Sequence, residues 1–228
     1  MNELNVVYHN KLNGVSLEKF SAIEMDLFMG ICLLMKDKGD AEQYLNLRQI
    51  REVSNYKSTS KERLEKDLFN VQKKLRYLNY ASIRTNKFVG DVYLFSAFGK
   101  CLDRDDTWLV AVNKYATYIL NHLTQEWTIF RLNEHNSLNS KYSKVLFRLL
   151  KQWRKVGKVS VTVEELRKHL DIPEGYSVSK IDERIINPAL DELSLYFQDL
   201  TVKKRYAVND RHHNYLEGYI FSFTPEAE

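Results

Sequence analysis

The two halves of this 228-residue sequence repeat one pattern of residues, and the repetition sharply narrows the folds open to the chain. Residues 45–51 shifted by 116 fall on residues 161–167, with apolar residues and an arginine aligned. Later matches need shifts of 117 and 118, as expected when insertions fall in loops. We therefore predict a duplicated domain, with one copy at 1–124, the other at 125–228 and a boundary near 122–127. The matched pairs are Leu45 with Val161, Leu47 with Val163, Ile50 with Leu166, Arg51 with Arg167, Leu64 with Ile181, Leu68 with Ile185 and Leu75 with Leu193.

Hydrophobic periodicity predicts the same order of elements in both halves. A helix and a short strand precede two further helices, and strand-like runs close each half. This order is typical of a winged helix-turn-helix domain, in which the second helix of the pair can enter a major groove. We expect an α+β, mostly helical fold of tandem winged helix-turn-helix domains with β-hairpin wings. The predicted helices include 17–36, 58–78, 141–157 and 178–196, and the predicted strands include 80–86, 91–98, 107–112, 159–163, 200–208 and 215–223, with a turn at Gly90-Asp91.

Composition excludes several classes of protein. The net charge of +4 is mild and does not by itself indicate a nucleic-acid partner. The longest apolar stretch, residues 27–35, is much shorter than the roughly 20 residues that span a bilayer, and no cationic and apolar leader opens the chain. We expect a cytoplasmic protein without a membrane partner. Cys32 and Cys101 lie in no metal-binding or disulfide pattern and are expected to be buried apolar residues.

Sequence motifs of enzymes are absent. The chain has no GxxxxGK[ST] loop, no HExxH and no GxSxG. His212, His213 and Tyr215 come nearest to a catalytic group, in the manner of rolling-circle nickases, but adjacent histidines on a strand point to opposite faces and cannot share a metal. We therefore expect a protein that is not an enzyme and that has no cofactor and no metal.

The start of the second helix of the first pair is rich in cations and hydroxyls. Residues 57–87 contain nine basic and three acidic residues. Cations and hydrogen-bond donors at a helix N-terminus suit DNA phosphates, because the helix dipole adds positive charge there. The alternative is a capped, solvated helix, which explains Ser60 but not the basic excess. The predicted DNA contacts are Lys57, Ser58, Thr59, Ser60, Lys61 and Arg63.

The corresponding helix of the second half offers base-reading side chains. Arginine pairs with guanine, asparagine with adenine, and glutamate with cytosine in the major groove. Pro188 removes one helical hydrogen bond and is expected to kink this helix. The following hairpin is basic, although charges on an edge strand can also serve only to prevent aggregation. The predicted contacts are Ser177, Ser179, Lys180, Glu183, Arg184 and Asn187 on the helix, and Lys203, Lys204 and Arg205, with Arg211 nearby, on the wing.

Residues 141–158 carry seven Lys or Arg and no acidic residue. On a helix, five of these cations form one stripe at spacings of 3, 4, 3 and 4, while apolar residues occupy much of the remaining surface. A solvated helix flank is the plainer interpretation, and a phosphate clamp is the functional one. We expect the stripe to clamp phosphate without reading bases. The stripe comprises Lys141, Lys144, Arg148, Lys151 and Lys155, and its first four members are the predicted phosphate contacts, with Lys155 as a further candidate.

Several stretches together resemble a known family. "YHNKLNG" at 8–14, the following "LEKFSAIEMDLFMGICLL", and the run from "LNSKYSKVLFRLLKQWRKVG" through "VTVEELRKHLDIPEGY" to "IDERIINPALDEL" are similar to plasmid replication initiators of the iteron-binding, theta-replicating class. The resemblance covers nearly the whole chain in the right order. The family's second recognition helix tends towards an Arg-rich run, and here it reads Asp182-Glu183-Arg184.

The resemblance implies two winged-helix domains that bind double-stranded DNA. Monomers would bind the repeated origin sites called iterons, help to melt the origin and recruit host initiator or helicase proteins. Homodimers joined through the first domain would bind an operator inverted repeat and repress the protein's own gene. The alternatives are a two-domain transcriptional regulator without a replication role, and a protein-interaction module whose basic surfaces meet acidic partners.

Overall fold

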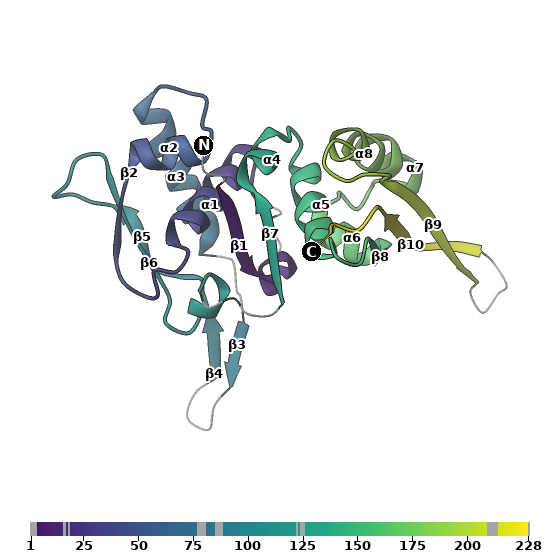
Figure 1. The fold of residues 1–228 in the computed structure, drawn as a ribbon, viewed down its shortest axis with the longest axis horizontal. Helices are drawn as coiled ribbons and strands as arrows, with labels where there is room; N and C mark the ends of the chain where they lie inside the picture. Colours follow the sequence, from purple (N-terminus) through teal and green to yellow (C-terminus); the bar gives the residue numbers. More distant parts are fainter. Residues whose placement is uncertain are drawn as a thin grey trace. The chain divides into compact units, whose positions relative to one another are not determined.

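The computed structural model forms two compact units (Figure 1). Unit 1 comprises Met1–Val15 and Lys19–Ser137, and unit 2 comprises Ser16–Glu18 and Leu138–Glu228. The chain divides after Ser137 and not after residue 124, because β7 (Trp127–Arg131) pairs with β1 (Asn5–His9) and so belongs to unit 1. The residues described are 4–15, 17, 19–76, 81–84, 89–121, 123, 126–208 and 214–227.

Unit 1 contains a helix-turn-helix pair and a three-stranded antiparallel sheet of order β2-β6-β5. The short strand β2 leads directly into the helix pair, and the hairpin of β5 and β6 forms the wing. Helix α1 starts behind a capping box in which Ser21 and Glu24 satisfy each other's backbone N–H groups. The elements are α1 (Ala22–Met35), β2 (Gln43–Asn46), α2 (Leu47–Val53), α3 (Lys61–Leu75), β5 (Phe95–Lys100) and β6 (Thr107–Val112).

A second hairpin in unit 1 corrects the predicted strands. Gly90 and Asp91 lie within β4 and pair with Ile83 and Ser82 of β3, so they do not form the expected turn. The predicted strand 91–98 is interrupted, because the chain bends at Leu94 to bury this side chain, which is 1% exposed. The additional elements of unit 1 are η1 (Asn10–Gly14), β3 (Ala81–Arg84), β4 (Val89–Val92), η2 (Thr117–Ile119) and α4 (Leu132–Ser137).

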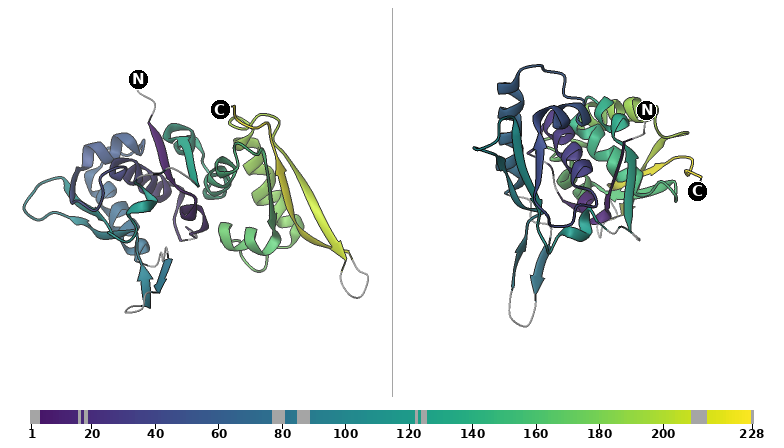
Figure 2. Two further views of the ribbon diagram at one scale, coloured as in Figure 1. Left: turned by 60° about the horizontal axis from the view of Figure 1, so that its bottom comes forward. Right: turned by 60° about the vertical axis from the view of Figure 1, so that its left-hand side comes forward.

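Unit 2 has the same plan, with a sheet of order β8-β10-β9 and a long wing formed by β9 and β10 (Figure 2). Its elements are α5 (Lys141–Gln152), β8 (Lys158–Thr162), α6 (Val163–Leu170), α7 (Val178–Ile181), the π-helical turn η3 (Asp182–Ile186), α8 (Asn187–Leu193), β9 (Thr201–Val208) and β10 (Asn214–Ser222). The predicted α+β fold of two winged helix-turn-helix domains is confirmed.

The duplication extends to the residues that start each helix. Asn46 caps α2 and Thr162 caps α6, and both do so through a capping box. Ser60 caps α3 and Ser177 caps α7. The two pairs of caps are separated by the shifts of 116 and 117 that align the two halves of the sequence. Local sequence signals therefore set the same helix boundaries twice.

Each unit has its own core. Helix α1 is buried on nearly all sides, with Met25, Leu27 and Phe28 at most 1% exposed, as expected for a helix without a polar face. In unit 2 the rings of Phe147, Phe197 and Phe223 form a cluster with centroid distances of 5.7 and 5.0 Å. The apolar residues that align the two helix pairs are buried, namely Leu64, Leu68, Leu75, Ile181, Ile185 and Leu193.

One of the two cysteines that were expected to be buried lies in the core. Cys32 is buried as expected, but Cys101 is half-buried, and the two cysteines form no disulfide with each other. Within the described part of the chain, no helix has both the length and the apolar character needed to cross a membrane.

Candidate nucleic-acid interface

In both helix-turn-helix pairs, an arginine of the first helix donates hydrogen bonds to backbone carbonyl oxygens near the start of the second helix. In unit 1, Arg51 Nη2 donates to the carbonyl oxygens of Thr59 at 3.0 Å and Ser60 at 3.4 Å. In unit 2, Arg167 donates through Nη2 to the Tyr176 carbonyl at 2.6 Å and through Nη1 to the Pro173 carbonyl at 3.2 Å. The same turn carbonyl is bound in both units, since Thr59 and Tyr176 each precede the N-cap of the next helix. We call that next helix the reading helix: α3 in unit 1, and α7, η3 and α8 together in unit 2.

The reading helices begin with serine caps, as predicted for Ser60. Ser60 Oγ accepts from the Arg63 N–H at 3.1 Å, and Ser177 Oγ accepts from the Lys180 N–H at 3.3 Å. Tyr56, in the turn of unit 1, donates its hydroxyl proton to Asp67 Oδ2 at 2.5 Å. Burial together with this hydrogen bond raises the pKa of Tyr56 to about 12. The turn and the reading helix of unit 1 are therefore joined at several points.

The predicted contact residues of unit 1 gather at the start of α3. Lys57, Thr59 and Arg63 are exposed, and Lys57 Nζ donates to Asn55 Oδ1 at 2.8 Å. Ser58 is half-buried, and Ser60 is exposed but committed to its cap. Lys61 forms an ion pair with Asp106 of the wing loop, which raises the pKa of Lys61 through a side-chain hydrogen bond. The exposed cations best placed to meet DNA in this unit are Lys57 and Arg63.

The reading helix of unit 2 presents most of its predicted residues to solvent. Lys180 is half-buried, with its ammonium group 4.3 Å from the centre of the Tyr176 ring. Arg184 and Asn187 can each make a bidentate contact with a purine, and Glu183 can accept from cytosine. The surface is therefore chemically able to distinguish bases. Its exposed members are Ser177, Ser179, Glu183, Arg184 and Asn187.

Pro188 was expected to kink the reading helix of unit 2, and the helix widens into a π-turn just before it. Pro188 lies in the first turn of α8, and the preceding five residues, Asp182–Ile186, form a π-turn. The Asn187 N–H bonds the Asp182 carbonyl, five residues earlier, in place of the usual four. Widening the helix here accommodates a proline ring that would clash in a regular α-helix. Glu183 and Arg184, two of the predicted base-reading residues, both lie in this turn.

The wing of unit 2 is bonded to its reading helix. Asp182 accepts from the Tyr219 hydroxyl at 2.8 Å and pairs with Lys204 at 2.5 Å. Burial and the hydrogen bond to Asp182 raise the pKa of Tyr219. Arg205 pairs with Glu217 at 2.8 Å and also donates to the Ser160 hydroxyl. Two of the three wing cations predicted to bind DNA thus have protein partners.

Of the other basic wing residues named from the sequence, Lys203 lies within the described residues and Arg211 does not. Lys203 is exposed. Arg211, His212 and His213 lie outside the described residues. Among the described wing residues, Lys203 is the cation best placed to meet DNA.

The cationic stripe of α5 is not the exposed surface that the sequence suggested. Lys144, Arg148 and Lys151 are 0, 2 and 7% exposed. Lys151 pairs with Glu226 at 2.6 Å, and its ammonium group lies 5.5 and 5.2 Å from the ring centres of Phe147 and Phe197. Lys141, at the start of the helix, pairs with Asp171 at 3.3 Å. The three cations are therefore not open to a DNA phosphate in this structure, contrary to the expected solvent-facing stripe.

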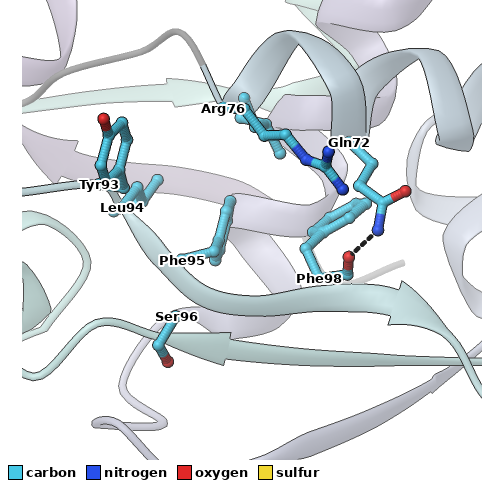
Figure 3. Close-up of a pocket in the computed structure, with 8 residues that line it drawn as sticks. Gln72, Arg76, Tyr93, Leu94, Phe95, Ser96 and Phe98 are labelled. Carbon is cyan, nitrogen blue, oxygen red and sulfur yellow. Dashed lines mark hydrogen bonds between the residues drawn. The ribbon is translucent and has the colours of Figure 1, made fainter.

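A cavity of about 470 Å³ lies at the C-terminal end of α3 (Figure 3). Gln72 and Arg76 line it from the helix, and Tyr93, Phe95 and Phe98 line it from the segment that follows β4. Gln72 Nε2 donates to the Phe98 carbonyl, which ties the helix to β5. The predicted DNA contacts lie at the opposite end of α3, so this cavity does not belong to the candidate interface.

The structural roles of Arg51, Arg167 and Asp182 were not predicted from the sequence. Arg51 and Arg167 appeared only as a matched pair, although an aligned arginine within a repeated helix-turn-helix was itself a signal for a shared structural role. Asp182 appeared only as a departure from the expected Arg-rich run, whereas the structure shows that it binds the wing. No local pattern indicates this second role, because Lys204 and Tyr219 lie far along the chain.

Each unit has the helix pair, the sheet and the wing in the order of a winged-helix domain, so the chain is a tandem winged-helix protein. Comparison with protein families assigns the two parts in the same order. Residues 5–151 match "Initiator Replication protein, WH1", and residues 162–223 match "Initiator Rep protein, WH2". The chain belongs to this family of initiator replication proteins, which confirms the resemblance seen in the sequence.

Individual relatives agree with the family. The chain is 29% identical over 225 residues to the "Probable replication protein rep" of Bifidobacterium longum (strain NCC 2705), a match that covers 97% of this chain and 73% of that protein. Among solved structures it is similar to the Pi initiator protein crystallised in complex with iteron DNA, with a TM-score of 0.70, 13% identity and full coverage of both chains. At this low identity the structural likeness supports the fold.

Proposed function

We propose that the chain initiates plasmid replication by binding repeated origin sites, iterons, with both of its winged-helix units, and that it performs no catalytic step. Family membership and the fold shared with an initiator that binds iteron DNA support this function. The observation that carries the proposal is the duplicated helix-turn-helix, in which an arginine and a serine cap hold each reading helix by the same contacts.

The exposed residues suggest that unit 1 mainly contacts DNA phosphates and that unit 2 mainly contacts bases. Lys57 and Arg63 at the start of α3 meet phosphates, while Arg184 and Asn187 of unit 2 meet base edges. Phosphate contacts strengthen binding to every sequence, whereas base contacts choose among sequences. We expect the reading helix of unit 2 to contribute more of the specificity.

The further roles implied by the family resemblance are part of the proposal. Monomers bind iterons, homodimers bind an operator inverted repeat and repress the gene, and DNA-bound protein recruits host initiator or helicase proteins. A plasmid that carries only this gene and its flanking DNA tests them together. Autonomous replication supports the initiator, and repression of a reporter without replication supports a transcriptional regulator instead.

Binding assays with unit-specific variants test the DNA contacts. Arg184→Ala should relax base preference at one position of the repeat by about 1 to 3 kcal/mol. Arg63→Ala, in the corresponding helix of unit 1, should weaken all sequences alike and lower the slope of log affinity against log salt by about 1. If Arg184→Ala weakened repeat and random DNA equally, the assignment of base reading to unit 2 would be wrong.

A further inference from the structure

The buried residues of the reading helix in unit 2 have a spacing that a regular α-helix does not keep in line. Ile181, Ile185, Ala189 and Leu193 are at most 1% exposed, and each lies four residues after the one before. In an α-helix of about 3.6 residues per turn, a step of four residues overshoots a full turn by about 40°, so Ile181 and Leu193 would point about 120° apart. Both side chains are nevertheless fully buried within unit 2.

The π-turn at Asp182–Ile186 removes this mismatch. It closes a hydrogen bond over five residues in place of four, so one turn of the helix takes up about one residue more. The chain from Ile181 to Leu193 then makes about three complete turns. The π-turn therefore keeps the buried side of the helix in line from one end to the other, and with it the exposed side.

The exposed side carries a row of three polar residues. Ser179, Glu183 and Asn187 are all exposed and have the same spacing of four. Glu183 lies two residues from both Ile181 and Ile185, which is about half a turn, so its side chain lies on the side opposite the core. In a helix-turn-helix this side of the second helix is the one that enters the major groove. Glu183 is thus the middle residue of the row that faces the groove.

The only charge in this row is the negative charge of Glu183. The neighbouring Asp182 is bound by Tyr219 and Lys204. Within the part of the chain that the structure describes, the Glu183 carboxylate has no hydrogen bond and no ion pair to compensate its charge. DNA phosphates repel such a carboxylate, so it weakens binding to every sequence unless it contacts a base.

We infer that Glu183 reads the central base pair of the unit 2 half-site and selects cytosine there. In the major groove a carboxylate accepts from the N4 amino group of cytosine. Guanine and thymine present acceptor oxygens, O6 and O4, which repel it. Arg184 lies to one side of the row and contacts a different base pair. The inference rests on the proposed function, because it requires the reading helix to bind DNA.

The test measures the affinity of the full chain and three variants for a set of duplexes of roughly 30 bp that carry one repeat from beside the gene. Each base pair of the repeat is replaced in turn by the other three. The variants are Glu183→Ala, Glu183→Gln and the control Glu174→Ala, which removes an exposed carboxylate from the turn before the reading helix. Thermal unfolding checks that each variant folds. A further duplex carries N4-methylcytosine at the base pair that Glu183→Ala affects.

Glu183→Ala should lose about tenfold of the preference for cytosine at one base pair, yet bind random DNA at least as tightly as the unsubstituted chain. Glu183→Gln should move the preference at that base pair towards adenine, because an amide pairs with N6 and N7 of adenine. N4-methylcytosine should weaken binding of the unsubstituted chain about tenfold and leave Glu183→Ala unaffected, because the methyl group blocks the amino donor. Glu174→Ala should keep the base preferences of the unsubstituted chain.

Three results overturn the inference. Glu183→Ala keeps the cytosine preference at every base pair; Glu183→Ala weakens all sequences alike, as the loss of a purely structural residue would; or Glu174→Ala changes the same preference as much. The proposed function survives each of these results, because Arg184→Ala tests it at another base pair. If the unsubstituted chain itself fails to bind the repeat, the proposed function fails, and the inference fails with it.

Discussion

Removing the arginine of each helix-turn-helix should destabilise the two units to different extents. Arg167 uses two nitrogens to bind two carbonyls, at 2.6 and 3.2 Å, whereas Arg51 uses one nitrogen at 3.0 and 3.4 Å. A hydrogen bond from a charged group contributes about 1.5 to 3 kcal/mol when buried, and these half-exposed sites justify about 1 kcal/mol per well-formed bond. We expect Arg167→Ala to cost about 2 kcal/mol and Arg51→Ala about 1 kcal/mol.

Native-state hydrogen exchange measured by mass spectrometry resolves the two units separately. Arg167→Ala should speed exchange of the reading-helix amides in unit 2, and Arg51→Ala should do so in unit 1. Arg48→Ala is the matched control, because this exposed arginine pairs with Glu52 on the same helix and its loss should change stability little. Equal costs for Arg48→Ala and Arg167→Ala, or exchange that rises only outside the helix pair, would refute the reasoning.

Burial lowers the pKa of His169, so protonation of this side chain opposes folding, and the free energy of unfolding should fall as the pH drops below the unfolded-state pKa of about 6.5. In denaturant titrations at several pH values, His169→Gln should weaken this pH dependence. An unchanged dependence of the unfolding free energy on pH would contradict the prediction. A Cβ at Gly218 would collide with the Val161 carbonyl, so Gly218→Ala should lower the melting temperature at a cost of about 1 to 3 kcal/mol, whereas Gly175→Ala, with open space around it, should change little. Lys151→Gln should lower the free energy of unfolding measured in urea, because it breaks the ion pair with Glu226. It should leave the salt dependence of DNA affinity unchanged, and a smaller slope of log affinity against log salt would show instead that Lys151 contacts a DNA phosphate.

Much of the fold could be predicted because its signals are local and repeated. Helix α6 begins at Val163, where the shift of 116 from Leu47 places it, and the caps Ser60 and Ser177 start helices at corresponding positions. The boundary between the units could not be predicted in this way. It depends on the pairing of β1 with β7, whose members are separated by more than a hundred residues, and neither strand has a distinctive pattern.

The candidate site was predictable where exposure follows from helical periodicity, as for Arg184 and Asn187. It was not predictable where a distant partner decides the role of a cation. Lys151 belongs to a convincing basic stripe, yet its partner Glu226 lies 75 residues away. Lys204 similarly pairs with Asp182 of a different element. Long side chains can bury their stems among apolar residues, so a cationic stripe does not by itself indicate a solvent-facing surface.

The central claim is that both winged-helix units bind one repeat. DNase footprinting of the full chain on the repeats flanking its gene tests it most directly. The account predicts protection of roughly 20 bp per monomer, as two half-sites about one helical turn apart, with Arg63→Ala and Arg184→Ala weakening different halves. Protection of a single half-site of about 10 bp, weakened by only one of the two substitutions, would contradict it.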